Sequence, residues 1–160
     1  MMLEAGWNDV SRSSKSEMKT AIIEMTEECV ARGINVILVT PNVSAQTFAD
    51  GINTQYAEVM HEAANEMTAK YESVIFVDLA SLSYDFLNDT YGTNTSAMTA
   101  NINLGTTYKK DNLHLSYLGA MKYAELIAQN MSDQGIDFIN KDFQWSCEDK
   151  EGNVFNMQVK

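Results

Sequence analysis

Residues 34–40 read INVILVT, an apolar and β-branched run that begins after Gly33 and stops at Pro41. Such a continuous apolar run is typical of a strand in a parallel sheet, which is buried on both faces. Shorter apolar runs stand before it at residues 1–5 (MMLEA) and after it at residues 74–77 (VIFV). The sequence therefore predicts three strands, the second of them buried.

The segments between these runs have helical spacing. Ser14 and Glu17 form the pattern of a capping box, in which the two side chains satisfy backbone N–H groups at a helix start. Gly33 ends this first helix. Its apolar residues are Met18, Ile22, Met25 and Cys29.

Three more helices are predicted, at residues 53–71, 79–87 and 116–131. The first has Tyr56, Val59, Met60, Ala63 and Met67 on its inner face, and the last has Ala120, Tyr123, Ala124, Ile127 and Met131. Residues 88–110 are rich in Asn, Thr and Gly, and they predict a long irregular loop, which in a compact domain is usually functional or mobile.

Alternating strands and helices predict an α/β fold in which parallel strands pair through right-handed crossovers. We expect a three-layer α/β/α sandwich at residues 1–131. Residues 132–160 form a tail, either a β-hairpin around residues 151–153 or the start of a further element. In such sheets ligands bind beyond the carboxyl ends of the strands.

Composition excludes several functions. The net charge is −11, with 11 Lys+Arg against 22 Asp+Glu, so nucleic acid and anionic membranes are disfavoured as partners. No apolar stretch approaches the roughly 20 residues that span a bilayer. The two cysteines and two histidines do not suggest a disulfide framework or a metal site. His61 is interpreted as structural or exposed.

Two short motifs stand where an α/β site is expected. Residues 6–9 read GWND after the first strand, and residues 111–114 read DNLH before the last helix. Asp111 could orient the imidazole of His114 and leave its second nitrogen free as a general base. The amide of Asn8 could stabilise the oxyanion of an acyl-transfer intermediate. Each motif could also be only a turn, because Gly, Asn and Asp are common turn residues.

These motifs, in this order, resemble the third (G-x-N-D) and last (D-x-x-H) blocks of the SGNH, or GDSL-type, hydrolases. Within that family the chain is most similar to rhamnogalacturonan acetylesterase-like carbohydrate esterases. The resemblance implies a serine esterase with Asn8 in the oxyanion hole, His114 as base and Asp111 as its partner. It implies no metal and no cofactor.

The chain departs from the family pattern because the Gly-Asp-Ser block with the nucleophile is absent. The serines at positions 11, 13 and 14 are interpreted as loop and cap residues. We therefore expect the C-terminal part of a longer esterase, truncated at the N-terminus, that is inactive alone. Such a truncated sheet would expose an edge prone to self-association.

The expected function of the parent protein is removal of acyl groups, above all acetyl, from a carbohydrate such as pectin. Trp7 and Asn42 are candidate substrate-binding residues. A polysaccharide esterase is usually exported, so a secreted parent is expected, with its signal outside this chain. Two alternatives stay open: a non-catalytic α/β binding or interaction domain, and a lipase-type member of the same family.

Overall fold

The computed structural model describes residues 1–103, 112–136 and 144–158. The chain forms two compact units. The first comprises Met1–Pro41 and Ile52–Ala80, and the second comprises Asn42–Gly51 and Ser81–Lys160.

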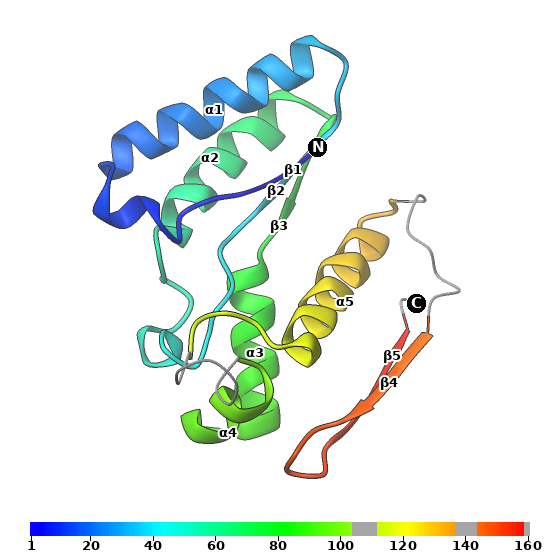
Figure 1. Cartoon of the computed structure of the whole chain (residues 1–160). Helices are drawn as coiled ribbons and strands as arrows, with labels where there is room; N and C mark the ends of the chain where they lie inside the picture. The colour runs from blue at the N-terminus through cyan, green and yellow to red at the C-terminus, as the bar shows by residue number, and fades with distance from the viewer. Residues whose placement is uncertain (104–111, 137–143, 159–160) are drawn as a thin grey trace. The chain divides into compact units, whose positions relative to one another are not determined.

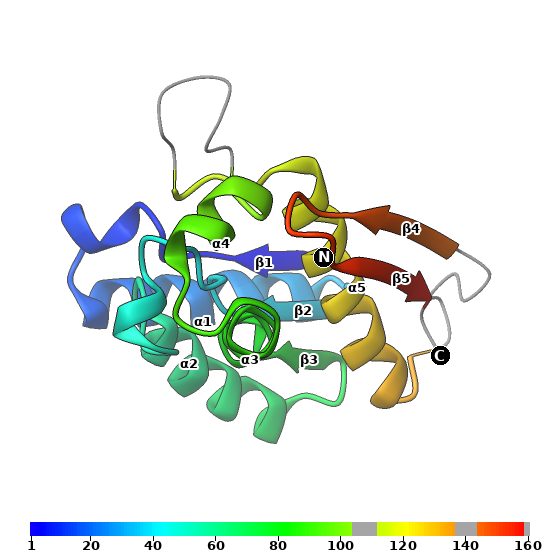
Figure 2. The same cartoon turned by 90° about the horizontal axis from the view of Figure 1, so that it is seen from below.

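A parallel sheet forms the centre of the first unit. Its strands β1 (Met2–Glu4), β2 (Val36–Val39) and β3 (Val74–Val77) stand in the order β1-β2-β3 (Figure 2). Glu4 pairs with Val39, and Val39 pairs with Val77, so the three strands end level with one another. The segments that follow them therefore all leave from one edge, called the carboxyl edge below.

Two helices, α1 (Lys15–Ala31) and α2 (Ala57–Lys70), pack against the same face of this sheet (Figure 1). Ile22 of α1, Leu38 of β2 and Met60 of α2 meet there and are at most 1% exposed. Strand β2 is buried along its whole length, as expected for the apolar run, but it is shorter than the predicted residues 34–40, and Ile34 before it is 40% exposed.

The predicted capping box is present at the start of α1. The Ser14 hydroxyl accepts a hydrogen bond from the backbone N–H of Glu17, and the Glu17 carboxylate accepts one from that of Ser14. Met25, one of the apolar residues at helical spacing, is 43% exposed and lies outside the core. Thr26 is buried in its place, and its hydroxyl is satisfied by donating to the Ile22 carbonyl, 2.7 Å away.

The second unit is largely helical. It contains α3 (Leu79–Tyr91) from Ser81 onward, α4 (Thr95–Asn101) and α5 (Tyr117–Asp133). The prediction of an irregular loop at residues 88–110 is wrong for its first half. Asn94 caps α4 by accepting from the N–H of Ala97, and burial of apolar side chains outweighs the low helix propensity of Asn and Thr. Residues 104–110 lie outside the described residues.

The inner face of α5 is also offset from its prediction. Tyr123 and Met131 are buried as expected, but Ala120 and Ala124 are exposed. The buried residues of the first two turns are Leu118, Gly119 and Tyr123. The helix is therefore rotated so that its small residue Gly119, rather than the two alanines, faces inward.

The tail forms a β-hairpin, one of the two structures that its sequence left open. Strand β4 (Gln144–Glu148) pairs antiparallel with β5 (Val154–Gln158) (Figure 2). The five-residue connection closes through the N–H of Asp149, which donates to the Asn153 carbonyl.

The predicted α/β fold class is confirmed, with a parallel three-stranded sheet flanked by helices. Among the helices that the structure describes, none combines the length and apolar character needed to cross a bilayer.

Self-association through the sheet edge stays a prediction. Strand β1 is an outer strand of the described sheet, and Met1 and Met2 are about half exposed, at 47% and 52%. We expect the chain to dimerise at high concentration, and Met2→Lys to suppress the dimer by placing a charge on the edge. Light scattering coupled to size exclusion measures this. A wild-type monomer at all concentrations would contradict it.

Candidate active site

The Gly6 turn begins directly after β1. Gly6 has φ +126°, in the region that favours glycine. A Cβ at this position would lie 2.3 Å from the Gln55 carbonyl oxygen and 2.9 Å from Cγ of Pro41. The Asp9 carboxylate accepts from the N–H of Gly6 at 2.9 Å. Sterics and this hydrogen bond therefore explain both the glycine and the aspartate of the GWND motif.

The two residues between them lie on the turn. Asn8 is exposed and precedes the short 3₁₀ helix η1 (Asp9–Ser11), where its side chain makes no capping hydrogen bond. Its backbone carbonyl accepts from the Ser11 hydroxyl at 3.4 Å. Trp7 is half-buried. The Asn8 side chain therefore lies exposed on the turn and does not cap the helix.

A polar cluster at the carboxyl edge joins the ends of β2 and β3. The Thr40 hydroxyl donates to the Asp78 carboxylate at 3.3 Å and accepts from the N–H of Ala80 at 2.7 Å. Nε2 of His61, on α2, lies 3.3 Å from the same carboxylate. His61, interpreted from the sequence as structural or exposed, is partly buried at 35% side-chain exposure and ties α2 to this edge.

The His114 segment lies in the second unit, where Asn103 holds it. The buried Asn103 amide donates to the carbonyls of Leu113 and His114, at 3.1 and 3.3 Å. Its oxygen accepts from the N–H of Ala45 at 3.2 Å. Asn103 was not identified from the sequence. Its buried side chain holds the backbone at His114, the predicted catalytic base, through these hydrogen bonds.

The loop after β2 is bonded to the same segment. The N–H of Gln46 donates to the Asn112 carbonyl at 3.1 Å. The Val43 carbonyl accepts from the Tyr123 hydroxyl at 2.8 Å, which fastens the loop to α5. Asn42 is at the start of this loop, and its amide donates to the Val43 carbonyl. The structure therefore brings the loop of Asn42 and the segment of His114 together.

The predicted site residues are divided between the units. Asn8 and Trp7 belong to the first unit, and Asn42 and His114 belong to the second. Asp111 lies outside the described residues, and His114 is exposed. That Asn8 and His114 face one pocket, and that Asp111 orients His114, stay predictions.

The start of α5 directly follows His114. Ser116 caps the helix by accepting from the N–H of Gly119 at 3.0 Å, and its hydroxyl donates to the Asn101 carbonyl. A Cβ on Gly119 would lie 2.2 Å from the Ile102 carbonyl oxygen. The absence of a side chain at Gly119 therefore lets α5 approach the backbone next to Asn103.

We expect Gly119→Ala to lower the free energy of unfolding by about 2 kcal/mol, because the methyl group collides with backbone. At a helix position with no neighbouring backbone, Gly→Ala would raise the free energy of unfolding by about 1 kcal/mol, because Ala has the higher helix propensity. Ala120→Gly, at the exposed next position, is the matched control and measures the propensity effect alone. Urea denaturation checks both, and unchanged or higher stability of Gly119→Ala would contradict the close packing.

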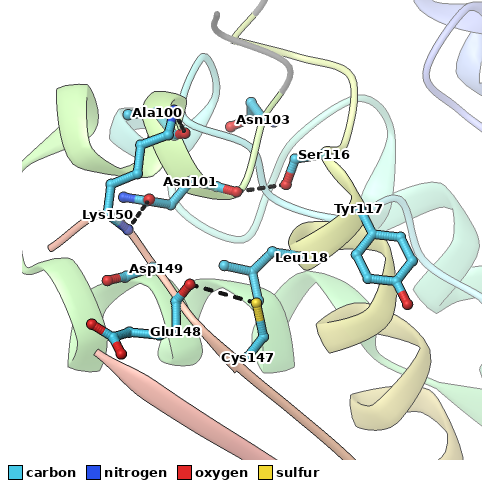
Figure 3. Close-up of a pocket in the computed structure, with 10 residues that line it drawn as sticks. All are labelled: Ala100, Asn101, Asn103, Ser116, Tyr117, Leu118, Cys147, Glu148, Asp149 and Lys150. Carbon is cyan, nitrogen blue, oxygen red and sulfur yellow. Dashed lines mark hydrogen bonds between the residues drawn. The ribbon is translucent and has the colours of Figure 1, made fainter. Parts of the chain in front are cut away.

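A cavity of about 390 Å³ opens beside this helix start (Figure 3). Asn101 and Asn103 line it from the end of α4, and Ser116 and Tyr117 from the start of α5. The hairpin supplies the remaining wall, with Cys147, Glu148, Asp149 and Lys150. The Lys150 ammonium reaches across to the Ala100 carbonyl at 3.0 Å.

Asp149 organises the hairpin wall of this cavity. Its carboxylate accepts from the Tyr91 hydroxyl at 2.8 Å, from the N–H groups of Glu151 and Asn153, and from the Asn153 amide. Burial acts most strongly on its pKa and would raise it. The hydrogen bonds from Asn153, Tyr91 and Glu151 together outweigh burial and hold the pKa below its usual value.

A lowered pKa in the folded state makes the contribution of Asp149 to stability pH-dependent. It is fully present above about pH 5 and is lost as the pH falls through the folded pKa, because the unfolded chain then binds more protons. We expect Asp149→Asn to lower the free energy of unfolding by about 2 kcal/mol at pH 7, and by less at pH 3. Thermal melts of both proteins at the two pH values check this. A difference that grows at low pH would contradict it.

Metal ligation finds no support in the part of the chain that the structure describes, where no group of three or more His, Cys, Asp or Glu side chains could hold an ion.

Comparison with known proteins adds one relative. Over 139 residues the chain is 30% identical to the uncharacterised esterase YxiM of Bacillus subtilis (strain 168), an alignment that covers 84% of this chain and 34% of YxiM. The crystal structure of YxiM is similar in fold, with a TM-score of 0.65 and 29% identity over 84% of this chain and 37% of that chain. No family model matches. The chain thus spans about a third of the length of the relative it matches.

Proposed function

We propose that this chain is the C-terminal part of an SGNH-type serine esterase that removes acetyl groups from a carbohydrate. The observation that carries the proposal is its sequence and fold similarity, over 84% of its length, to a protein named as an esterase. The GWND turn at the carboxyl edge and the His114 segment held by Asn103 are consistent with it.

In the proposed mechanism the nucleophilic serine lies in a segment that precedes residue 1, in keeping with the greater length of YxiM. His114 accepts the serine proton as the serine oxygen attacks the ester carbonyl, and it then gives that proton to the leaving sugar oxygen, which departs as a hydroxyl. Water then attacks the carbonyl of the acyl-enzyme with His114 again as base, which releases acetate and restores the serine. Asp111 holds the imidazole in the required tautomer, and the Asn8 amide donates to the oxyanion. This acyl transfer needs neither a metal nor a cofactor.

The substrate class and location follow from the same family resemblance. An acetylated polysaccharide is a substrate outside the cell, so the parent protein is proposed to be secreted. Trp7 and Asn42 are proposed to contact the sugar near the ester.

The experiment is acetate release by the longer protein that carries both the serine block and this chain. Acetylated oligosaccharides should be hydrolysed, whereas this chain alone should release no acetate. Asn8→Ala should lower kcat by about 10²-fold with little change in KM, because the oxyanion forms only after attack.

Three outcomes would count against parts of this proposal. A preference for long-chain acyl esters would favour a lipase. Sugar binding without any hydrolysis by the longer protein would favour a non-catalytic binding domain. An unchanged kcat in Asn8→Ala would remove Asn8 from the oxyanion hole.

A further inference from the structure

Two aromatic side chains, Tyr117 and Trp145, are in contact at the start of α5, and Tyr117 lines the cavity described above. The Tyr117 and Trp145 rings meet edge to face, with centroids 5.9 Å apart and planes at 62°. Tyr117 is the first residue of α5 and is 70% exposed. An aromatic ring this exposed contributes little to a core, so its face remains available to a ligand.

The strand geometry places Trp145 on the same face of β4 as a residue that lines the cavity. Side chains alternate along a strand, so Trp145 and Cys147 lie on one face of β4, and both are half-buried while Gln144, Ser146 and Glu148 are exposed. Cys147 lines the cavity together with Tyr117 (Figure 3). Trp145 therefore shares a face of β4 with a residue that lines the cavity, and it contacts a second such residue, Tyr117.

The charged side chains that line the cavity favour a ligand that carries no negative charge. Glu148 and Asp149 contribute two carboxylates against the one ammonium of Lys150, which already donates to the Ala100 carbonyl. Glu151 stands beside them and accepts from the Asn101 amide. A sugar with free hydroxyls can donate to the exposed Glu148 carboxylate, whereas a uronic acid would bring a further negative charge to an acidic wall.

We propose that this cavity binds a neutral sugar residue, stacked on Tyr117 and Trp145, so that the substrate is an acetylated neutral glycan rather than a uronate-rich pectin. This inference rests on the proposed function and names its substrate class. The cavity adjoins the catalytic segment, because Asn103 lines it and donates to the His114 carbonyl. A sugar bound there would contact Asn103, which holds the backbone of the proposed base.

The test is a binding titration of this chain, which needs no hydrolysis. The two tryptophans of the chain are Trp7 and Trp145, so intrinsic fluorescence reports the site. Xylotetraose or mannotetraose should change the emission of the wild-type chain, and tetragalacturonate should not. In Trp145→Phe the part of the emission change that comes from position 145 should be lost, so the neutral sugar should change the emission less than in the wild-type chain.

Matched variants at position 117 separate stacking from folding. Tyr117→Ala should weaken binding of the neutral tetrasaccharide by about tenfold or more, whereas Tyr117→Phe, which keeps the ring, should bind nearly as well as wild type. Calorimetry measures both, and thermal melts equal to wild type show that the variants are folded.

Absence of neutral-sugar binding, equal binding in Tyr117→Ala, or preference for the galacturonate would each overturn the inference, while leaving the esterase proposal standing. Failure of the longer protein to release acetate would overturn the esterase proposal, while a positive titration would still locate the sugar site.

Discussion

Replacement of His114 by Ala should lower kcat for acetate release by about 10⁴-fold in the longer esterase that contains this chain. Without the imidazole, the serine hydroxyl keeps its proton and the leaving sugar oxygen receives none, so attack on the ester and departure of the sugar both lose their proton carrier. KM should change little, because the imidazole contributes to the transition state rather than to binding of the sugar.

The second histidine of the sequence provides the matched control. His61 lies on α2 with Nε2 3.3 Å from the Asp78 carboxylate, and it packs edge to face on Phe76. We expect His61→Ala to lower the melting temperature modestly, through loss of these two contacts, and to leave kcat within about twofold. Equal loss of kcat in both variants, or loss in His61→Ala alone, would contradict the role assigned to His114.

Gly6→Ala should lower the free energy of unfolding by about 3 kcal/mol, the largest stability effect expected here. Two costs add at this position. A backbone at φ +126° strains any residue with a side chain, and the new methyl group would lie 2.3 Å from the Gln55 carbonyl oxygen. Relief of that collision would move the turn that carries Asn8.

Gly33→Ala is its control. Gly33 also has a positive φ, +73°, but no atom lies within 4 Å of a Cβ built there. This variant should therefore report the backbone cost alone, about 1 kcal/mol. Guanidinium denaturation of the two variants measures the difference. Equal destabilisation would contradict the steric argument for the glycine of the GWND motif.

The sequence predicted the elements whose signals are local. The capping box of Ser14 and Glu17 and the apolar run at residues 74–77 each depend on neighbouring residues, and both are confirmed. Helix α4 was missed because its Asn- and Thr-rich sequence has weak helix propensity and is stabilised by burial of Ala97 and Met98.

Only those parts of the candidate site that have a local sequence signal were predicted. Residues near Asn8 and His114 could be proposed from short motifs in the chain. Asn103 could not, because one asparagine in an Asn-rich stretch has no signal before its partners at Ala45 and His114 are known. The pairing of Tyr117 with Trp145 likewise joins segments 28 residues apart and depends on the hairpin lying beside α5.

The most direct test of the account is the proximity of positions 8 and 114. Cysteines placed by Asn8→Cys and His114→Cys, with Cys29 and Cys147 changed to Ser, can be joined by a short bis-maleimide and the product read by mass spectrometry. A control pair joins position 8 to Glu72→Cys, which precedes β3 and so lies at the opposite edge of the same sheet. We expect an intramolecular cross-link between positions 8 and 114 and none in the control pair. Failure of positions 8 and 114 to cross-link in the folded chain would contradict a shared active site.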